Sequence, residues 1–216
     1  NRSLVEKILA ENDIGPLFIA MDNCPHQVVL VGTEGPAEKM KAALKEHRVL
    51  CEPLSFRRGY HTPLFDPVSE RLREVFQKFP ISKPRVPVWS CTLKGPYPED
   101  LEEVRALLAD HWIEPVAFRE TVDKLYEEGY RTFVEVGPRG NLTAFVQDIL
   151  RGRPFLAIPS NLPRRSGLAQ LHHLLGMLAA LWWGWGIGSG LVFGLALSVA
   201  STVVLIKALE QRGLLQ

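Results

Sequence analysis

Phe56-Arg-Arg-Gly-Tyr-His-Thr-Pro-Leu-Phe-Asp-Pro67 places a histidine between a Gly-Tyr pair and a Thr-Pro turn. His61 therefore lies on a constrained connection, and scaffolds present chemical groups on such connections. A histidine titrates near neutral pH and can shuttle a proton. By itself the stretch favours a histidine that is hydrogen-bonded into a loop, so its function has to be argued from the rest of the chain.

Strand and helix patterns alternate on both sides of this stretch. A capping-box pattern, Ser3-Leu-Val-Glu6, predicts an N-terminal helix to residue 11, and Asn141 is placed to cap a later helix. Strands alternating with helices predict a parallel sheet covered on both faces. The expected strands are 17–21, 27–32, 49–56, 86–93, 131–136 and 155–158. The other expected helices are 35–47, 67–79, 99–112, 118–128, 141–150 and 167–180.

The composition excludes several classes of function. The chain has 216 residues and a net charge of +1, so it offers no electrostatic case for nucleic-acid binding. Its cysteines, Cys24, Cys51 and Cys91, lie far apart without a CxxC spacing. A structural zinc site or a disulfide framework is therefore not expected, and a cytoplasmic location fits this cysteine usage.

The C-terminal region differs in composition from everything before it. No charged residue occurs from Leu174 to Ile206, a run long enough to span a bilayer. The tryptophan-rich start of this run also favours a membrane segment. The alternative is a hydrophobic helix that completes a soluble core.

Three further candidate sites are weak. His172 and His173 are adjacent, so on a helix their side chains point about 100° apart and do not suit a metal pair. The turn Gly137–Gly140 precedes a helix but lacks a phosphate-loop spacing, so a structural turn is expected. Cys24 beside Asn23 has no local group that would activate its thiol. No metal site is expected.

Four segments taken together resemble the malonyl-type acyl-CoA:acyl-carrier-protein transacylases, including acyltransferase domains of polyketide and polyunsaturated fatty acid synthases. The similarity covers about residues 1–181. The segments are Asn23-Cys-Pro-His-Gln-Val-Val-Leu-Val-Gly32, Tyr60-His-Thr-Pro63, His111-Trp-x-x-Pro-Val-x-Phe118, and Phe133-Val-Glu-Val-Gly-Pro138 with Asn141-Leu-Thr143.

The resemblance implies ping-pong acyl transfer. A serine on a GxSxG elbow attacks the acyl-CoA thioester with a histidine as general base, and the acyl group then passes to an acyl carrier protein. His61 would be that base, and the backbone carbonyl of His111 would orient it, a role independent of the His111 side chain. Asn23 and Tyr60 would contact substrate. No bound cofactor is implied; acyl-CoA is the substrate, and the phosphopantetheine belongs to the partner carrier protein.

The resemblance also implies an α/β fold with a partial α/β-hydrolase-like large lobe and a small ferredoxin-like lobe, followed by a C-terminal hydrophobic helix. The expected divisions are a helix of the large lobe at 1–16, the small α/β lobe at 17–56, the later part of the large lobe at 57–181, and a hydrophobic tail at 182–216.

The family's nucleophile motif is missing. No GxSxG occurs, because Ser189 has Ile187 and Leu191 at the glycine positions. The expectation is a C-terminal part of a transacylase without turnover of its own, with GxSxG upstream of Asn1.

The tail contains Gly194-Leu-Ala-Leu-Ser-Val-Ala-Ser-Thr-Val-Val-Leu205 and Ala208-Leu-Glu-Gln-Arg-Gly-Leu-Leu215. These stretches resemble a membrane helix of cation:proton antiporters. This leaves two alternatives open: a non-catalytic carrier-protein docking module that contacts a membrane through residues 182–206, and a fragment of an antiporter fusion.

Overall fold

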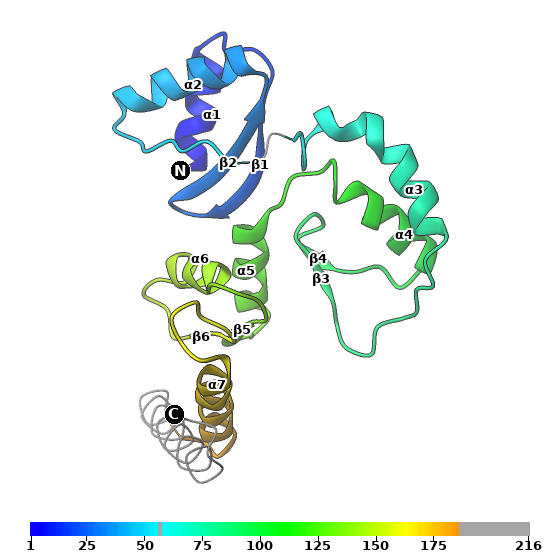
Figure 1. The fold of residues 1–216 in the computed structure, drawn as a ribbon, viewed down its shortest axis with the longest axis vertical. Helices are drawn as coiled ribbons and strands as arrows, with labels where there is room; N and C mark the ends of the chain where they lie inside the picture. The colour runs from blue at the N-terminus through cyan, green and yellow to red at the C-terminus, as the bar shows by residue number, and fades with distance from the viewer. Residues whose placement is uncertain (56–57, 186–216) are drawn as a thin grey trace, which may run out of the picture. The chain divides into compact units, whose positions relative to one another are not determined.

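The computed structural model describes residues 1–55 and 58–185, which divide into two compact units (Figure 1). The first unit is Asn1–Gly129, and the second begins at Tyr130. In the first unit the elements are α1 (Arg2–Glu11), β1 (Leu17–Cys24), β2 (Gln27–Gly32), α2 (Glu34–Glu46), the 3-10 helix η1 (Pro63–Val68), α3 (Ser69–Gln77), β3 (Trp89–Ser90), β4 (Gly95–Pro96), α4 (Leu101–Asp110) and α5 (Phe118–Glu127). In the second they are β5 (Thr132–Glu135), α6 (Asn141–Ile149), β6 (Leu156–Pro159) and α7 (Gly167–Trp182).

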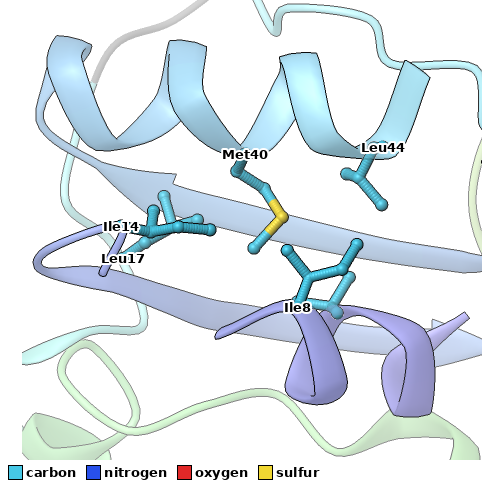
Figure 2. Packing of buried hydrophobic residues seen from close by; sticks show 6 residues of the cluster. Ile8, Ile14, Leu17, Met40 and Leu44 are labelled. Atoms are coloured by element: carbon cyan, nitrogen blue, oxygen red, sulfur yellow. The ribbon is translucent and has the colours of Figure 1, made fainter. Parts of the chain in front are cut away.

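The N-terminal core lies between two helices and an antiparallel hairpin. Strands β1 and β2 pair from Leu17 opposite Gly32 to Cys24 opposite Gln27. Figure 2 shows Ile8 of α1 and Met40 and Leu44 of α2 pointing toward one another above the hairpin. Burial of such side chains is the main favourable term in folding. Helix α1 therefore shares a core with the hairpin, while the domain boundaries expected from the sequence stay a prediction.

A parallel bridge joins β1 to the segment that precedes α5. The amide of Asp22 donates to the carbonyl of Val116, and the amide of Val116 donates to the carbonyl of Ala20, each at 2.9 Å. The same segment is anchored to the β3–β4 region, since the amide of Ala117 donates to the carbonyl of Cys91 at 3.0 Å. The residues that directly precede α5 are thus held by backbone bonds from two directions.

Helices α3 and α4 are joined by two arginines. Arg73 on α3 lies 2.9 Å from the carboxylate of Asp110, the last residue of α4. Arg105 on α4 donates to the carbonyls of Phe76 and Phe79 at 2.6 and 2.8 Å, and so satisfies groups that the end of α3 leaves unpaired. The C-terminal end of α4 is therefore tied to α3 by charge-assisted bonds.

The second unit is built on a parallel strand pair. Strands β5 and β6 pair from Thr132 opposite Leu156 to Glu135 opposite Pro159. Leu156 and Ile158 of β6 pack against Leu174 and Met177 of α7. The buried amide of Gln170 on α7 also donates to the carbonyl of Pro159 at 2.7 Å, so α7 is held to β6 by both apolar and polar contacts.

The expected single parallel sheet is not observed in residues 1–55 and 58–185. These residues form three two-stranded sheets, of which only β5–β6 is parallel. The strand expected at 49–56 is wrong over its described residues, 49–55. Leu50 and Leu54 are 83% and 49% exposed, and Pro53 has no amide to donate to a neighbouring strand. The strand expected at 86–93 is reduced to Trp89–Ser90, because Pro87 interrupts it.

Two predicted helix caps are also wrong. The cap of α1 is Asn1, whose side chain accepts from the amide of Leu4 at 2.9 Å, and Ser3 lies inside the helix. The N-cap of α6 is Gly140, so Asn141 is the first helical residue. In each helix the predicted boundary is displaced because another group satisfies the first turn.

The predicted membrane segment lies largely outside the described residues. Of the tail at 182–216, the structure describes only 182–185, with Trp182 ending α7. Within residues 1–55 and 58–185, no helix has the length and apolar character that crossing a membrane requires.

Candidate active site

His61 lies on a tight connection between Gly59 and η1. The hydroxyl of Thr62, a fully buried residue, donates to the carbonyl of Gly59 at 2.7 Å and closes the turn. A Cβ on Gly59 would approach Leu64 Cβ to 3.0 Å, so a larger residue there would crowd η1. His61 has a φ of 61°, a left-handed conformation that is costly for a residue with a side chain. Such conformations persist where the surroundings impose them.

Two backbone carbonyls after α4 hold His61. The Nδ1 atom of its ring lies 2.7 Å from the main-chain oxygen of His111. Its amide donates to the main-chain oxygen of Trp112 at 2.8 Å. A carbonyl oxygen only accepts hydrogen bonds, so Nδ1 of His61 carries the proton in this contact. In the neutral ring, Nε2 then has a free lone pair and can accept a proton.

Aromatic side chains surround the peptide of His61. The Tyr60 ring lies 4.8 Å from the Phe65 ring and 5.7 Å from the Trp112 ring, measured between centroids. Phe65 and Trp112 stack at 6.0 Å. Rings at these separations attract one another beyond the area they bury. The cluster joins the residue before His61 to the residue after His111, and so ties the two segments together.

The side chain of His111 has its own set of contacts. Its Nε2 atom lies 2.9 Å from the hydroxyl oxygen of Ser90, and the Tyr97 ring meets the imidazole edge-on at 5.9 Å. Burial lowers the pKa of the His111 imidazole, and the neighbouring His61 ring lowers it further, while Asp110 opposes the shift. The neutral form of His111 is therefore favoured in the folded protein.

Ser90 was not singled out from the sequence. It is 2% exposed, and its hydroxyl oxygen accepts from the amides of Thr92 and Leu93 at 3.1 and 3.2 Å. Ser90 lies 21 residues before His111 and has no motif around it, so no local pattern signals the contact.

Asn23 and Tyr60, the two predicted substrate contacts, lie in different surroundings. Asn23 lies near the end of β1, and its amide donates to the side chain of Gln27 at 3.0 Å across the hairpin turn. That contact uses the Asn23 amide within the hairpin. Tyr60 directly precedes His61 and belongs to the aromatic cluster. Only Tyr60 is thereby brought next to His61, and a role in substrate binding stays a prediction for both.

The turn before α6 is occupied by a carboxylate of the chain itself. Glu135 accepts from the amide and the hydroxyl of Thr143 at 2.8 and 2.7 Å, and so satisfies the first turn of α6. The helix end that could have bound an anion is thus neutralised internally.

The remaining candidates do not form a metal site. Within residues 1–55 and 58–185, no group of three or more His, Cys, Asp or Glu side chains could hold a metal ion. His173 is 7% exposed and lies on α7 together with His172. Burial raises the pKa of the Cys91 thiol, which makes the reactive thiolate less available.

Known proteins share this sequence and fold. The family model described as "Acyl transferase domain" matches residues 2–172. The malonyl CoA-acyl carrier protein transacylase of Bacillus subtilis is 29% identical over 158 residues, which cover 73% of this chain and 49% of that protein. The chain thus spans about half the length of this curated relative.

Two crystal structures agree with this similarity. The acyltransferase domain from the second module of the salinomycin polyketide synthase superposes with a TM-score of 0.71 and 27% identity. The match covers 87% of this chain and 42% of the salinomycin chain. The malonyl CoA-acyl carrier protein transacylase from Clostridium perfringens superposes with a TM-score of 0.72 and 26% identity. The match covers 84% of this chain and 55% of the Clostridium chain. The mixed α/β fold and the family model together show that the chain belongs to the acyl transferase domain family, with the malonyl-CoA:acyl-carrier-protein transacylases and polyketide synthase acyltransferase domains.

Proposed function

We propose that this chain supplies the general base of an acyl transferase that moves a malonyl-type group from coenzyme A to an acyl carrier protein. The base is His61. The observation that carries the proposal is the 2.7 Å contact between His61 Nδ1 and the carbonyl of His111. It fixes both the tautomer and the direction of the ring, which are the two properties a general base needs from a neighbour.

The backbone supports the same assignment. His61 keeps its left-handed φ of 61° while its amide donates to the carbonyl of Trp112. Strained residues cluster at sites where geometry matters for chemistry. A histidine that only filled a loop would have no need of two carbonyls and an aromatic cluster to hold it.

The proposed reaction has two half-reactions with balanced proton transfers. A serine hydroxyl attacks the thioester carbon and gives its proton to His61 Nε2, and the departing thiolate of coenzyme A takes that proton. The phosphopantetheine thiol then gives its proton to Nε2 and attacks the acyl-serine. Nε2 returns the proton to the serine oxygen as that ester breaks. His61 is unchanged at the end of each cycle.

The nucleophile in this proposal lies outside the 216 residues, which contain no GxSxG sequence. Ser90 is not a substitute, because it is 2% exposed and its oxygen accepts two amides. Acyl-CoA and the carrier protein are the substrates by analogy with the Bacillus subtilis transacylase, whose name states that reaction. Tyr60, next to the base, is the better candidate of the two predicted substrate contacts.

The fold proposal extends the observed α/β architecture. We assign the hairpin and α2, within residues 17–56, to a small ferredoxin-like lobe, and residues 57–181 to part of an α/β-hydrolase-like lobe. Helix α1 was expected in the large lobe, but we assign it to the small lobe because it shares a core with the hairpin. Two features support this assignment: the hairpin core shared by α1 and α2, and the parallel pairing of β5 with β6.

A chimera tests the function. Residues 2–172 of this chain replace the aligned segment of the Bacillus subtilis malonyl CoA-acyl carrier protein transacylase, and transfer of a radiolabelled malonyl group from coenzyme A to carrier protein is measured. The intact Bacillus enzyme is the control. Transfer above the uncatalysed rate is expected. A folded chimera that becomes acylated on its serine by another acyl-CoA but never by malonyl-CoA would contradict the malonyl assignment, and one never acylated would contradict the function.

A further inference from the structure

We propose that the side chain of His111, held by Ser90, is a positioning residue for His61. The inference rests on the proposed function, since it concerns how the base is oriented. The expectation from the family resemblance was that only the backbone carbonyl of residue 111 matters. The structure assigns a task to the imidazole as well.

The hydrogen-bond directions at Ser90 follow from the number of donors and acceptors on its hydroxyl group. A hydroxyl oxygen has two lone pairs and one proton. Both lone pairs of Ser90 accept backbone amides, from Thr92 at 3.1 Å and Leu93 at 3.2 Å. The remaining contact, 2.9 Å to His111 Nε2, is therefore made by the Ser90 proton. His111 Nε2 is the acceptor, so the neutral ring carries its own proton on Nδ1.

Ser90 contacts a histidine nitrogen, as a catalytic serine does, but its hydroxyl is not accessible to a substrate. A hydroxyl paired with a histidine nitrogen is the arrangement of an activated nucleophile. Here, however, the residue is 2% exposed and both lone pairs that would attack a substrate are engaged. The hydroxyl donates to the imidazole and fixes it in place. The contact between Ser90 and His111 is therefore structural, and it limits the movement of residue 111.

The connection from imidazole to base runs through a single residue. His111 is the C-cap residue that directly follows α4, and its own amide donates to the carbonyl of Leu107 at 2.9 Å. Its carbonyl is among those that a helix end leaves without a helical partner, and it accepts from His61 Nδ1. With the amide held by α4 and the side chain held by Ser90, the carbonyl has little freedom to turn away from His61.

The contact between His111 and Ser90 also depends on the charge of the His111 imidazole. A protonated His111 would present a proton at Nε2 to an oxygen that already accepts two amides, so the contact with Ser90 would be lost. The groups facing this ring are His61, Tyr97, Asp110 and Ser90. Burial favours the neutral ring, which is the form that the Ser90 contact requires.

The test uses the full chain with ¹⁵N-labelled histidine and long-range ¹H–¹⁵N NMR spectra of the imidazoles. In the unaltered chain we expect His61 protonated on Nδ1 and His111 protonated on Nδ1, with an unprotonated Nε2 on each. In Ser90→Ala, the His61 Nδ1 proton should exchange with water about tenfold faster, as expected for losing one buried hydrogen bond. Ser90→Thr keeps the hydroxyl and should restore slow exchange.

The control is Ser69→Ala. Ser69 is 4% exposed in the same unit and donates to Asp66 at 3.0 Å, so it loses a comparable bond outside the Ser90–His111 pair. Its His61 exchange rate should equal that of the unaltered chain. Equal slowing or speeding in both alanine variants would mean a general loss of stability and would overturn the proposal.

Three other results would overturn it. They are a proton on Nε2 of His111 in the unaltered chain, unchanged His61 exchange in a folded Ser90→Ala chain, and acylation of Ser90 itself by malonyl-CoA. The NMR spectra do not require catalytic turnover. A chimera that transfers no malonyl group would therefore contradict the proposed function without contradicting this inference. Normal malonyl transfer by the chimera, together with unaltered His61 exchange in Ser90→Ala, would contradict this inference and support the proposed function.

Discussion

The guanidinium Nη2 of Arg119 lies 2.8 Å from Oδ2 of Asp22, a carboxylate that is almost completely buried in β1. Arg2 of α1 lies farther away, at 3.7 Å from the same oxygen. The other carboxylate oxygen has no hydrogen-bond partner within the described residues. Arg119 is thus the main group that compensates a buried charge, and it connects α5 with the N-terminal hairpin.

Replacing Arg119 with alanine should destabilise the first unit. Removing one partner of a buried pair leaves an uncompensated charge, for which about 3 kcal/mol is the usual cost. The nearby Arg2 should reduce this loss somewhat. Urea denaturation monitored by tryptophan fluorescence measures the change.

Lys41→Ala is the matched control, because Lys41 pairs with Glu38 at 3.4 Å and both side chains are more than half exposed. Its effect should stay within about 0.5 kcal/mol. A smaller loss for Arg119→Ala than for the control would show that Asp22 is stabilised in some other way.

Replacing Glu135 with alanine should destabilise helix α6. The carboxylate accepts from both the amide and the hydroxyl of Thr143, and losing a helix-capping acceptor costs about 1 kcal/mol. Hydrogen exchange of the first amides of α6 measures the local effect. Thr143→Ser, which keeps the hydroxyl, should exchange almost as slowly as the unaltered chain. Equal protection in Glu135→Ala would mean that another group caps the helix.

Acidification should destabilise the first unit through His111. Burial and the neighbouring His61 ring lower the pKa of the His111 imidazole from its ordinary value of 6.5. Below that value the unfolded chain takes up a proton that the folded chain still excludes, so the free energy of unfolding decreases as the pH falls. Above it both states are neutral at this position, and His111 gives no pH dependence.

The measurement compares urea denaturation at about pH 7.5 and about pH 5.5, on either side of the ordinary histidine pKa. His111→Gln should lose less stability between the two conditions than the unaltered chain does. Ser69→Ala, which removes no titratable group, should lose as much stability between the two conditions as the unaltered chain. A His111→Gln chain with the full pH dependence would contradict the role given to burial at this position.

The elements with a strong local pattern were predicted well. The strands expected at 17–21 and 27–32 correspond to β1 and β2, and the helix expected at 99–112 contains α4. The family resemblance, on the residues of its four segments, identified the family. The expected contact between His61 and the main-chain oxygen of His111 is present at 2.7 Å, while the catalytic roles of both residues stay a proposal. These features depend on residue types at fixed spacing, which a sequence displays directly.

The features that were missed depend on contacts between distant residues. Nothing near Ser90 signals that its hydroxyl meets His111, and nothing near His61 signals a left-handed backbone at a non-glycine residue. The expected strand at 49–56 had suitable apolar residues, but among residues 1–55 and 58–185 no strand pairs with its described part, and Leu50 and Leu54 are exposed. Tertiary pairing decides such segments, and local preference does not.

The central claim is that His61 is the general base, and one rate comparison tests it most directly. In the chimera with the Bacillus subtilis enzyme, malonyl transfer to carrier protein is measured for His61→Ala and for the control His47→Ala, with circular dichroism confirming that both are folded. If His61 is the general base, His61→Ala lowers the transfer rate about a hundred- to ten-thousand-fold, the usual contribution of a positioned base. The rate for His47→Ala should be unchanged. A folded His61→Ala chimera that transfers malonyl at the control's rate would show that His61 is not the general base.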